Sequence, residues 1–463
     1  MTKASLTVQQ HHINQIFPGN NGKEEIIREP EILLCGQCEI ASDPWKRETH
    51  LKYLSQRVFT EVEDSGNFSD SFIEALTIAS DKNLTVALVY TYSDDILSFT
   101  AQIEIEVRKL FNLAQDHNGL ETKLLTIFLT PEKQLSGRLL LGEKSNLSLS
   151  MIRVIGNSIR LHYADRGKSF SPKVLQRQAL AFGEALNQDL SMLRIGIVGC
   201  GGTGSAVAMF LSRLRVGHIA LFDHDFVEDT NLNRLHGSRQ ADADAMKPKV
   251  EVVARSITEL GLGIKVVGYQ NWVGDLECRD ALKSCDLIFG CTDDHSGRII
   301  LNRFAYYYLT PLIDMGLAID VGHEDIPTIK ALDGRVTVVI PQHTCLMCNG
   351  VINPDVAYSE SLKRLNPNEY ERQKAEAYVI GEGNPSPAVV TFTTDVASMA
   401  VQEMLHRLQG FRGDGGAIAN RVRKFRLMSD RHQSAKPHPD CPLCAQEDCW
   451  GRGDIEPFLD LVG

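Results

Sequence analysis

The sequence has no apolar run long enough to cross a bilayer, and its N-terminus, M-T-K-A-S-L-T-V-Q-Q, contains no apolar signal core. Basic residues are in the minority as well: 48 lysines and arginines against 59 aspartates and glutamates give a net charge of −11. A charge of this sign gives no general attraction to nucleic acid. We therefore expect a cytoplasmic protein with no membrane or nucleic-acid partner.

The 11 cysteines occur without a secretory signal, which indicates thiols and metal ligands rather than disulfides. Hydrophobic residues make up 43% and charged residues 23% of the chain, as in ordinary globular proteins. Because 463 residues exceed one ordinary core, we expect two or three domains. The motifs below favour one domain at 1–165 and a second at 166–463.

The second region is organised around Arg194–Asp225, in which a β-branched apolar run ends in G-C-G-G-T-G and a second apolar strand ends at Asp223. Four glycines form the turn: Gly199, Gly201, Gly202 and Gly204. The first permits a tight turn, the next two let the backbone approach phosphate, and the last lets the helix pack closely. Asp223 is placed to accept hydrogen bonds from ribose. Taken alone, this pattern is most typical of NAD or FAD binding.

Charged residues beyond the glycine turn favour ATP instead. Arg234 and Lys249 follow the ribose acid, where cations can neutralise the triphosphate, and Asp293 ends the next strand as a hard oxygen ligand suited to Mg²⁺. Arg177, ahead of the glycine strand, can reach phosphate in cis or across a dimer. Since strand ends of a doubly wound sheet meet at one crevice, we expect these groups to share one ligand.

The ordered motifs G-x-G-G-x-G, D-x-D, N-L-x-R, P-K-V-E and C-T-D, within about Gln176–Gln409, resemble those of the ThiF/MoeB/ubiquitin-activating superfamily. The resemblance implies an α/β fold with a Rossmann-like doubly wound sheet, preceded here by a smaller α/β domain. It also implies that Asp223 contacts the ribose, that Arg234 and Lys249 contact the phosphates, and that Asn231 helps to position them. Asp293 would hold magnesium, and Arg177 would contact ATP, often from the partner subunit of a homodimer.

The activity that the resemblance implies is adenylation, by ATP, of the C-terminal carboxylate of a ubiquitin-like or sulfur-carrier protein. Adenylation of a peptide or of a tRNA-linked carboxylate by the same fold is one alternative. A non-catalytic scaffold subunit is the other, although the set Arg234, Lys249 and Asp293 argues against it.

Two C-x-x-C pairs, Cys345 with Cys348 and Cys441 with Cys444, offer four thiolates, the ligand set of a structural zinc site. Relatives often carry an acyl-accepting cysteine in the loop between such pairs, but no cysteine occurs from Asn349 to Asp440 here.

This absence leaves three routes after adenylation. An external nucleophile, such as an E2-like or other acceptor protein, can take the acyl group. An oxyester can form on Ser386 or on another loop serine or threonine, or Cys449 can serve instead. A serine would need a base or strong positioning.

The region 1–165 resembles JAB/MPN isopeptidase domains in one stretch. At the positions of that family's zinc ligands and of its serine, this chain has Tyr90, Tyr92, Ser98 and Ala101. Alanine cannot bind zinc and tyrosine rarely does, so the resemblance implies a metal-free, inactive relative.

Two further features of this region lack a clear chemical role. Cys35 and Cys38 form a C-x-x-C after a predicted strand, which we interpret as plain thiols rather than as half a zinc site. The first thirty residues are polar, and we expect them to be partly disordered. Later in this region, the sequence predicts a long helix over Gln102–Gln115.

Overall fold

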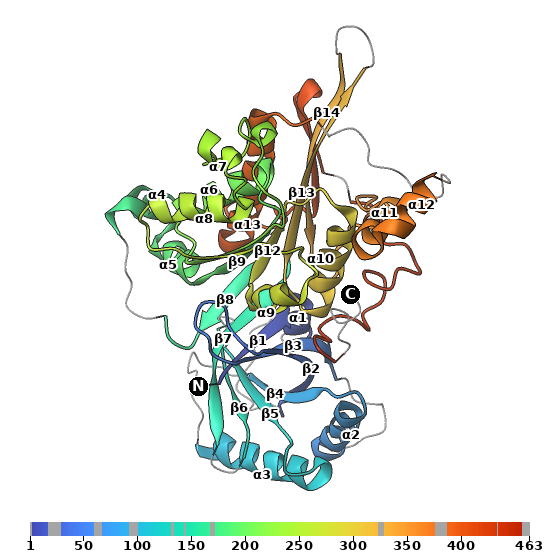
Figure 1. The fold of residues 1–463 in the computed structure, drawn as a ribbon. Helices are drawn as coiled ribbons and strands as arrows, with labels where there is room; N and C mark the ends of the chain where they lie inside the picture. The colour runs from blue at the N-terminus through green and yellow to red at the C-terminus, as the bar shows by residue number, and fades with distance from the viewer. Residues whose placement is uncertain are drawn as a thin grey trace. The chain divides into compact units, whose positions relative to one another are not determined.

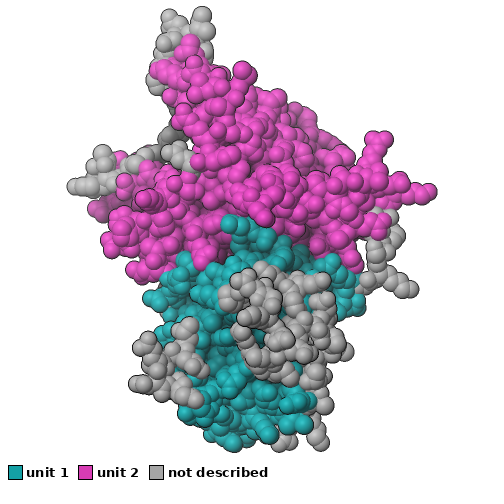
Figure 2. Space-filling view, turned by 180° about the vertical axis from the view of Figure 1, so that it is seen from behind, with its two compact units in different colours: residues 1–168, 307–309, 447–457 teal, residues 169–306, 310–446, 458–463 magenta. Residues whose placement is uncertain are grey.

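The computed structural model describes residues 2–16, 29–59, 67–91, 101–130, 134–142, 145–166, 172–322, 328–375, 387–432 and 434–455. The chain forms two compact units, coloured separately in Figure 2. Unit 1 comprises residues 1–168, 307–309 and 447–457, and unit 2 comprises residues 169–306, 310–446 and 458–463. Nothing in the sequence signalled that residues 447–457 group with unit 1.

Unit 1 is built on one sheet with the strand order β1-β3-β2-β4-β5-β6-β7-β8. Because β1 also pairs with β7, the first seven strands form a closed ring, and β8 pairs with β7 (Figure 1). The strands are β1 (Lys3–Gln9), β2 (Glu31–Ile40), β3 (His50–Val58), β4 (Thr85–Thr91), β5 (Leu124–Leu129), β6 (Leu135–Leu140), β7 (Asn146–Ile155) and β8 (Ile159–Tyr163).

Successive side chains of β4 belong alternately to two apolar clusters of unit 1. Ala87 and Val89 belong to one apolar cluster, and Val86 and Leu88 belong to a second cluster, which includes side chains from helices α2 (Phe68–Asp81) and α3 (Ala101–Asn118). Successive side chains of a strand point to opposite faces, so a strand buried on both faces reads as continuously apolar.

Of the first thirty residues, which we expected to be partly disordered, residues 2–16 contain a strand and a helix, whereas residues 17–28 lie outside the described part of the chain. Residues 3–9 form β1, whose side chains are almost all buried, and α1 (Gln10–Ile16) follows directly. The polar side chains of β1 find internal partners. Thr7, for example, accepts a hydrogen bond from the buried Arg153 at 3.0 Å, so polarity here reflects a buried network rather than exposure.

Unit 2 contains an eight-stranded sheet in the order β11-β10-β9-β12-β13-β14-β15-β16. The pairs from β11 to β13 are parallel, and those from β13 to β16 are antiparallel. The strands are β9 (Arg194–Val198), β10 (His218–Phe222), β11 (Lys265–Tyr269), β12 (Leu287–Gly290), β13 (Leu312–Val321), β14 (Ile329–Val339), β15 (Asn420–Lys424) and β16 (Ser429–His432). This order confirms the predicted Rossmann-like doubly wound sheet.

Helices cover both faces of this sheet, with α6 and α8 on one side of the central strands and α10 on the other (Figure 1). The helices of unit 2 are α4 (Gln176–Phe182), α5 (Glu184–Met192), α6 (Gly202–Arg213), α7 (Gln240–Asp244), α8 (Lys249–Glu259), α9 (Arg279–Ser284), α10 (His295–Tyr307), α11 (Pro354–Leu365), α12 (Pro367–Ala375) and α13 (Val390–Gln409). The charged sequence Asn353–Gly383 is typical of a loop, but its described part contains helices α11 and α12. No helix of the described residues has both the length and the apolar character needed to span a membrane.

Gly204 should be the least replaceable glycine of the turn, because a Cβ atom there would lie 1.8 Å from the backbone oxygen of Gly199. We expect Gly204→Ala to lower the free energy of unfolding by about 2–4 kcal/mol, since backbone must move to relieve the clash. Gly201→Ala is the matched control: a Cβ atom there meets nothing within 4 Å, so stability should change by less than about 0.5 kcal/mol. Denaturant unfolding compares the two, and equal losses would refute this packing argument.

Candidate functional site

The site begins where β9 ends in the glycine turn. Gly199 has φ +90°, a conformation that favours glycine, and a Cβ atom there would lie 2.7 Å from the backbone of Cys291. Helix α6 then starts without a side-chain cap at Gly201. Its first N–H groups therefore keep their capacity to bind an anion at the positive end of the helix.

Asp223 lies at the end of β10, against the glycine turn. Its carboxylate accepts hydrogen bonds from the backbone N–H of Cys200 at 2.6 Å and of Asp225 at 2.8 Å. Burial raises the pKa of Asp223, and the charge of Lys249 together with these two hydrogen bonds opposes that rise. An acid held this way has its orientation fixed, as a ribose-binding carboxylate requires.

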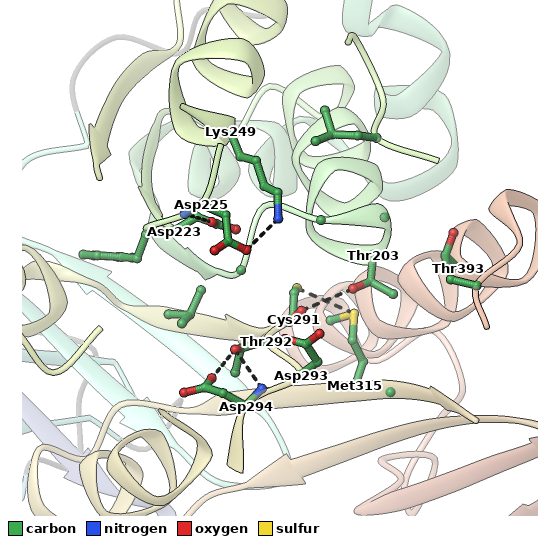
Figure 3. A pocket seen from close by; sticks show the side chains of 18 of the residues that line it. Thr203, Asp223, Asp225, Lys249, Cys291, Thr292, Asp293, Asp294, Met315 and Thr393 are labelled. Carbon is green, nitrogen blue, oxygen red and sulfur yellow. Dashed lines mark hydrogen bonds and ion pairs between the residues drawn. The ribbon is translucent and has the colours of Figure 1, made fainter. Parts of the chain in front are cut away.

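Lys249 is the first residue of α8, and its Nζ lies 2.7 Å from Oδ2 of Asp225 (Figure 3). Burial by itself would lower the pKa of Lys249, but the charges of Asp223, Asp225 and Asp293 raise it, so the side chain stays cationic. Asp223, His224 and Asp225 also form a cluster with ligand atoms within 4.8 Å of one another. Because Nζ of Lys249 already pairs with Asp225, part of the negative charge of this cluster is offset without a metal ion.

Arg234 and Asn231 come from the loop after β10. Arg234 packs its side chain over Gly202, 3.4 Å from where a Cβ atom would lie, and donates to the backbone oxygen of Thr230 and to Oδ1 of Asn233. Oδ1 of Asn231 accepts from the N–H of Glu228 at 3.1 Å. The amide nitrogen of Asn231 lies 3.5 Å from the hydroxyl of Thr230 in the same loop. Both residues line the cavity described next.

A cavity of about 520 Å³ lies over the glycine turn in unit 2. Its wall includes eight of the site residues named in the sequence analysis: Gly199, Gly201, Gly202, Asp223, Asn231, Arg234, Lys249 and Asp293. Pro387, Ala388 and Thr393 close it from the start of α13. The cavity is thus bounded by cations, by an uncapped helix start and by carboxylates, the surroundings that a nucleotide triphosphate with a metal ion requires.

Two neighbouring aspartates after β12 have different surroundings. Asp294 accepts from Trp272 Nε1 at 3.0 Å, from the N–H of Gly297 at 2.8 Å and from the hydroxyl of Thr292. Burial would raise the pKa of Asp294, but these hydrogen bonds lower it. Asp293 is exposed, and Figure 3 draws its carboxylate turned away from that of Asp294. Asp293 is therefore the aspartate available to a metal ion.

Comparison with known proteins agrees with this geometry. The model of the ThiF family matches residues 175–444, more than half of the chain. The chain belongs to the ThiF family.

Individual relatives match this ThiF-family chain over part of their length. Ubiquitin-like modifier-activating enzyme 5 of Oryza sativa subsp. japonica is 27% identical over 292 residues, which cover 59% of this chain and 60% of that protein. Sulfur carrier protein ThiS adenylyltransferase of Escherichia coli (strain K12) is 31% identical over 139 residues, which cover 30% of this chain and 55% of that protein. The crystal structure of E. coli MccB with MccA-N7isoASN is 17% identical, with a TM-score of 0.46, and the match covers 62% of this chain and 78% of that one.

Some predicted residues of the ThiF-family site lie elsewhere. Gly204 supports the turn from within α6 and does not line the cavity. Arg177 is exposed on α4 and is not part of the cavity wall. Ser386 lies outside the described residues. Cys449 is buried in unit 1 and is not among the described residues that line the cavity.

The four cysteines of the two C-x-x-C pairs come together in unit 2. Sγ of Cys345 lies 3.8 Å from Sγ of Cys441, and Sγ of Cys348 lies 3.7 Å from Sγ of Cys444. All four sulfurs lie within 4.8 Å of one another. Tetrahedral Zn²⁺ with bonds of about 2.3 Å requires sulfur separations of about 3.8 Å. The two printed separations match this requirement, so the cluster suits a zinc ion.

The C-x-x-C of unit 1 is different. Cys35 and Cys38 are both buried within β2, which runs through the motif instead of ending before it. Neither belongs to a potential metal cluster among the described residues. Burial also raises the pKa of Cys35. Both are buried cysteines without a disulfide, and the interpretation as plain thiols stays a prediction.

The JAB/MPN resemblance stays a prediction. Tyr90 is buried on β4, and its hydroxyl lies 3.5 Å from the Glu106 carboxylate. Tyr92, Ser98 and the side chain of Ala101 lie outside what the structure describes. The family match begins at residue 175 and leaves this region uncovered.

Sequence reasoning missed Asn271 and Trp272, which follow β11 and line the cavity. Their only sequence signal is position, because a loop after a parallel strand of such a sheet opens on the same crevice as the others. His236 was missed as well: its Nε2 lies 3.1 Å from the Thr394 hydroxyl, a contact that ties the start of α13 to the Arg234 loop.

Proposed function

We propose that this chain uses ATP to adenylate the C-terminal carboxylate of a ubiquitin-like or sulfur-carrier protein, releasing pyrophosphate. The observation that carries the proposal is the cavity wall itself, where Arg234 and Lys249, the uncapped start of α6 and the exposed Asp293 surround one space. The names of the two relatives, one for a ubiquitin-like modifier and one for a sulfur carrier, supply the substrate class.

Each residue has a distinct task in this proposal. Asp223 orients the ribose, and the N–H groups of α6, with Asn231, position the phosphates. Arg234 and Lys249 neutralise the negative charge that grows on the leaving pyrophosphate when the carboxylate attacks the α-phosphorus. Asp293 would hold Mg²⁺, which would supply further positive charge to offset that of the phosphates. No protein nucleophile is needed in this step, because positioning and charge supply the rate.

The acyl group then passes to an external acceptor, for which an E2-like protein is one candidate. This route is supported by the lack of cysteine from Asn349 to Asp440 and by the burial of Cys449. We also propose a homodimer in which Arg177 of α4 serves the cavity of a second copy. Arg177 is exposed, and its neighbour Leu180 is 84% exposed, as expected for residues that a second copy covers.

Exchange of labelled pyrophosphate into ATP tests the proposal, because the label returns to ATP only after a carboxylate has been adenylated. We expect exchange with a ubiquitin-like or sulfur-carrier protein that has a free C-terminus. The matched control is the same carrier with an amidated C-terminus, which should support none. Exchange with a short peptide but with no such carrier would favour the peptide alternative. No exchange with any carboxylate would reject adenylation. Mass spectrometry of the enzyme afterwards detects any acyl adduct.

A further inference from the structure

Helix α11 packs on the N-terminal end of α10, the helix that begins immediately after Asp293 and Asp294. The N–H of Asn353, at the start of α11, donates to Nδ1 of His295 at 3.0 Å. Two turns further along α11, Oε2 of Glu360 accepts from the N–H of Ser296 at 2.8 Å. Helix α11 is thus fixed to the first residues of α10 by hydrogen bonds across 58 and 64 residues of sequence.

The start of α10 is capped by two carboxylates from different parts of the chain. Asp294 accepts from the N–H of Gly297, and Glu360 accepts from the N–H of Ser296. A helix leaves its first N–H groups without internal partners, and negative charge there is favourable. Because Asp294 and Glu360 fill this role, Asp293 stays free to face the cavity.

Arg364, one turn after Glu360, stacks on Trp272. Its guanidinium carbon lies 3.3 Å from the centre of the indole ring, and its Nη1 lies 3.5 Å from the hydroxyl of Ser296. The indole Nε1 in turn donates to Asp294 at 3.0 Å. Trp272 has little room to move, since a Cβ atom on Gly274 would lie 2.0 Å from its ring.

We propose that Arg364 is a positioning residue for the nucleotide site, acting through Trp272 and Asp294 on the loop that carries Asp293. The expected effect of Arg364 on activity rests on the proposed function. The contacts of Arg364 with Trp272 and Ser296 do not depend on that function. A planar guanidinium on an indole is a favourable, orientation-dependent contact. Through this contact, α11 holds the loop that carries Asp293 in place at the cavity.

Hydrogen exchange of residues 291–297 tests this without any substrate. We expect Arg364→Met to speed amide exchange there roughly tenfold, because the loop loses the stack that restrains it. Arg364→Lys keeps the charge but loses the planar stack, so it should restore little. Arg372→Met is the matched control, since Arg372 on the neighbouring α12 pairs with Glu369 and is not among the described residues that line the cavity.

Activity gives a second readout that a purely structural role would not move. In pyrophosphate exchange, Arg364→Met should raise the Mg²⁺ concentration for half-maximal rate roughly tenfold, while Arg372→Met should not. Unchanged hydrogen exchange of residues 291–297 in Arg364→Met would overturn the proposal, whatever the activity. If the unmodified protein shows no pyrophosphate exchange while the loop still loosens in Arg364→Met, the proposed function fails and the positioning role stands.

Discussion

Asp293→Ala should reduce pyrophosphate exchange by about 100- to 1,000-fold, the usual cost of removing one group that offsets charge in the transition state. Asp293 is an exposed carboxylate of the cavity, while its neighbour Asp294 is engaged by hydrogen bonds from Trp272 and Gly297. In the proposed function Asp293 would hold Mg²⁺, so its replacement should weaken binding of the metal ion. The rate is measured with saturating ATP and carrier, over a range of Mg²⁺ concentrations.

Two further measurements make the Asp293 result specific. The free energy of unfolding of Asp293→Ala should stay within about 0.5 kcal/mol of the unmodified protein, because an exposed side chain contributes little to the fold. Asp293→Asn keeps the shape but not the charge, so it should lose most of the activity too. Undiminished exchange in Asp293→Ala would mean that the metal site lies elsewhere.

The parts of the site that the sequence could predict are those set by local geometry. Gly199, Gly204 and Asp223 are fixed by the path of one β-α-β unit, and their spacing along the chain is the spacing that the fold requires. The structure gives each the expected place: Gly199 with positive φ, Gly204 against the Gly199 carbonyl, and Asp223 beside the turn. Lys249 and Asp293 could be added because ends of parallel strands meet at one edge.

The remaining parts depend on contacts between distant residues. Strand β1 is polar in sequence, and its burial becomes clear only from its pairing with β3 and with β7, which is about 145 residues later. The same holds for α11, which reads as a charged loop. Its Arg364 meets Trp272 across 92 residues, and neither residue type indicates a nucleotide site by itself. Pairing at such range is set by the whole fold, so no local pattern encodes it.

The four-cysteine cluster gives the second large expected effect. Cys441→Ser should remove bound zinc, from about one ion per chain to none, and lower the free energy of unfolding by at least about 3 kcal/mol. Cys441 and Cys444 lie 96 residues from their partners, Cys345 and Cys348, so the ion would close a long loop. Elemental analysis measures the metal, and denaturant unfolding measures the stability.

Hydrogen bonds also hold the segments that carry the four cysteines, so the loss of zinc should not unfold them completely. The Thr344 hydroxyl donates to the backbone oxygen of Ala435 at 2.6 Å, and the N–H of Leu346 donates to Asn302 at 2.9 Å. Cys441→Ser should therefore loosen this region without unfolding unit 2. Cys278→Ser is the control: Cys278 is buried outside the cluster, so this change should cost stability and leave the zinc content unchanged. Equal zinc content in Cys441→Ser and the unmodified protein would show that the cluster is not a zinc site.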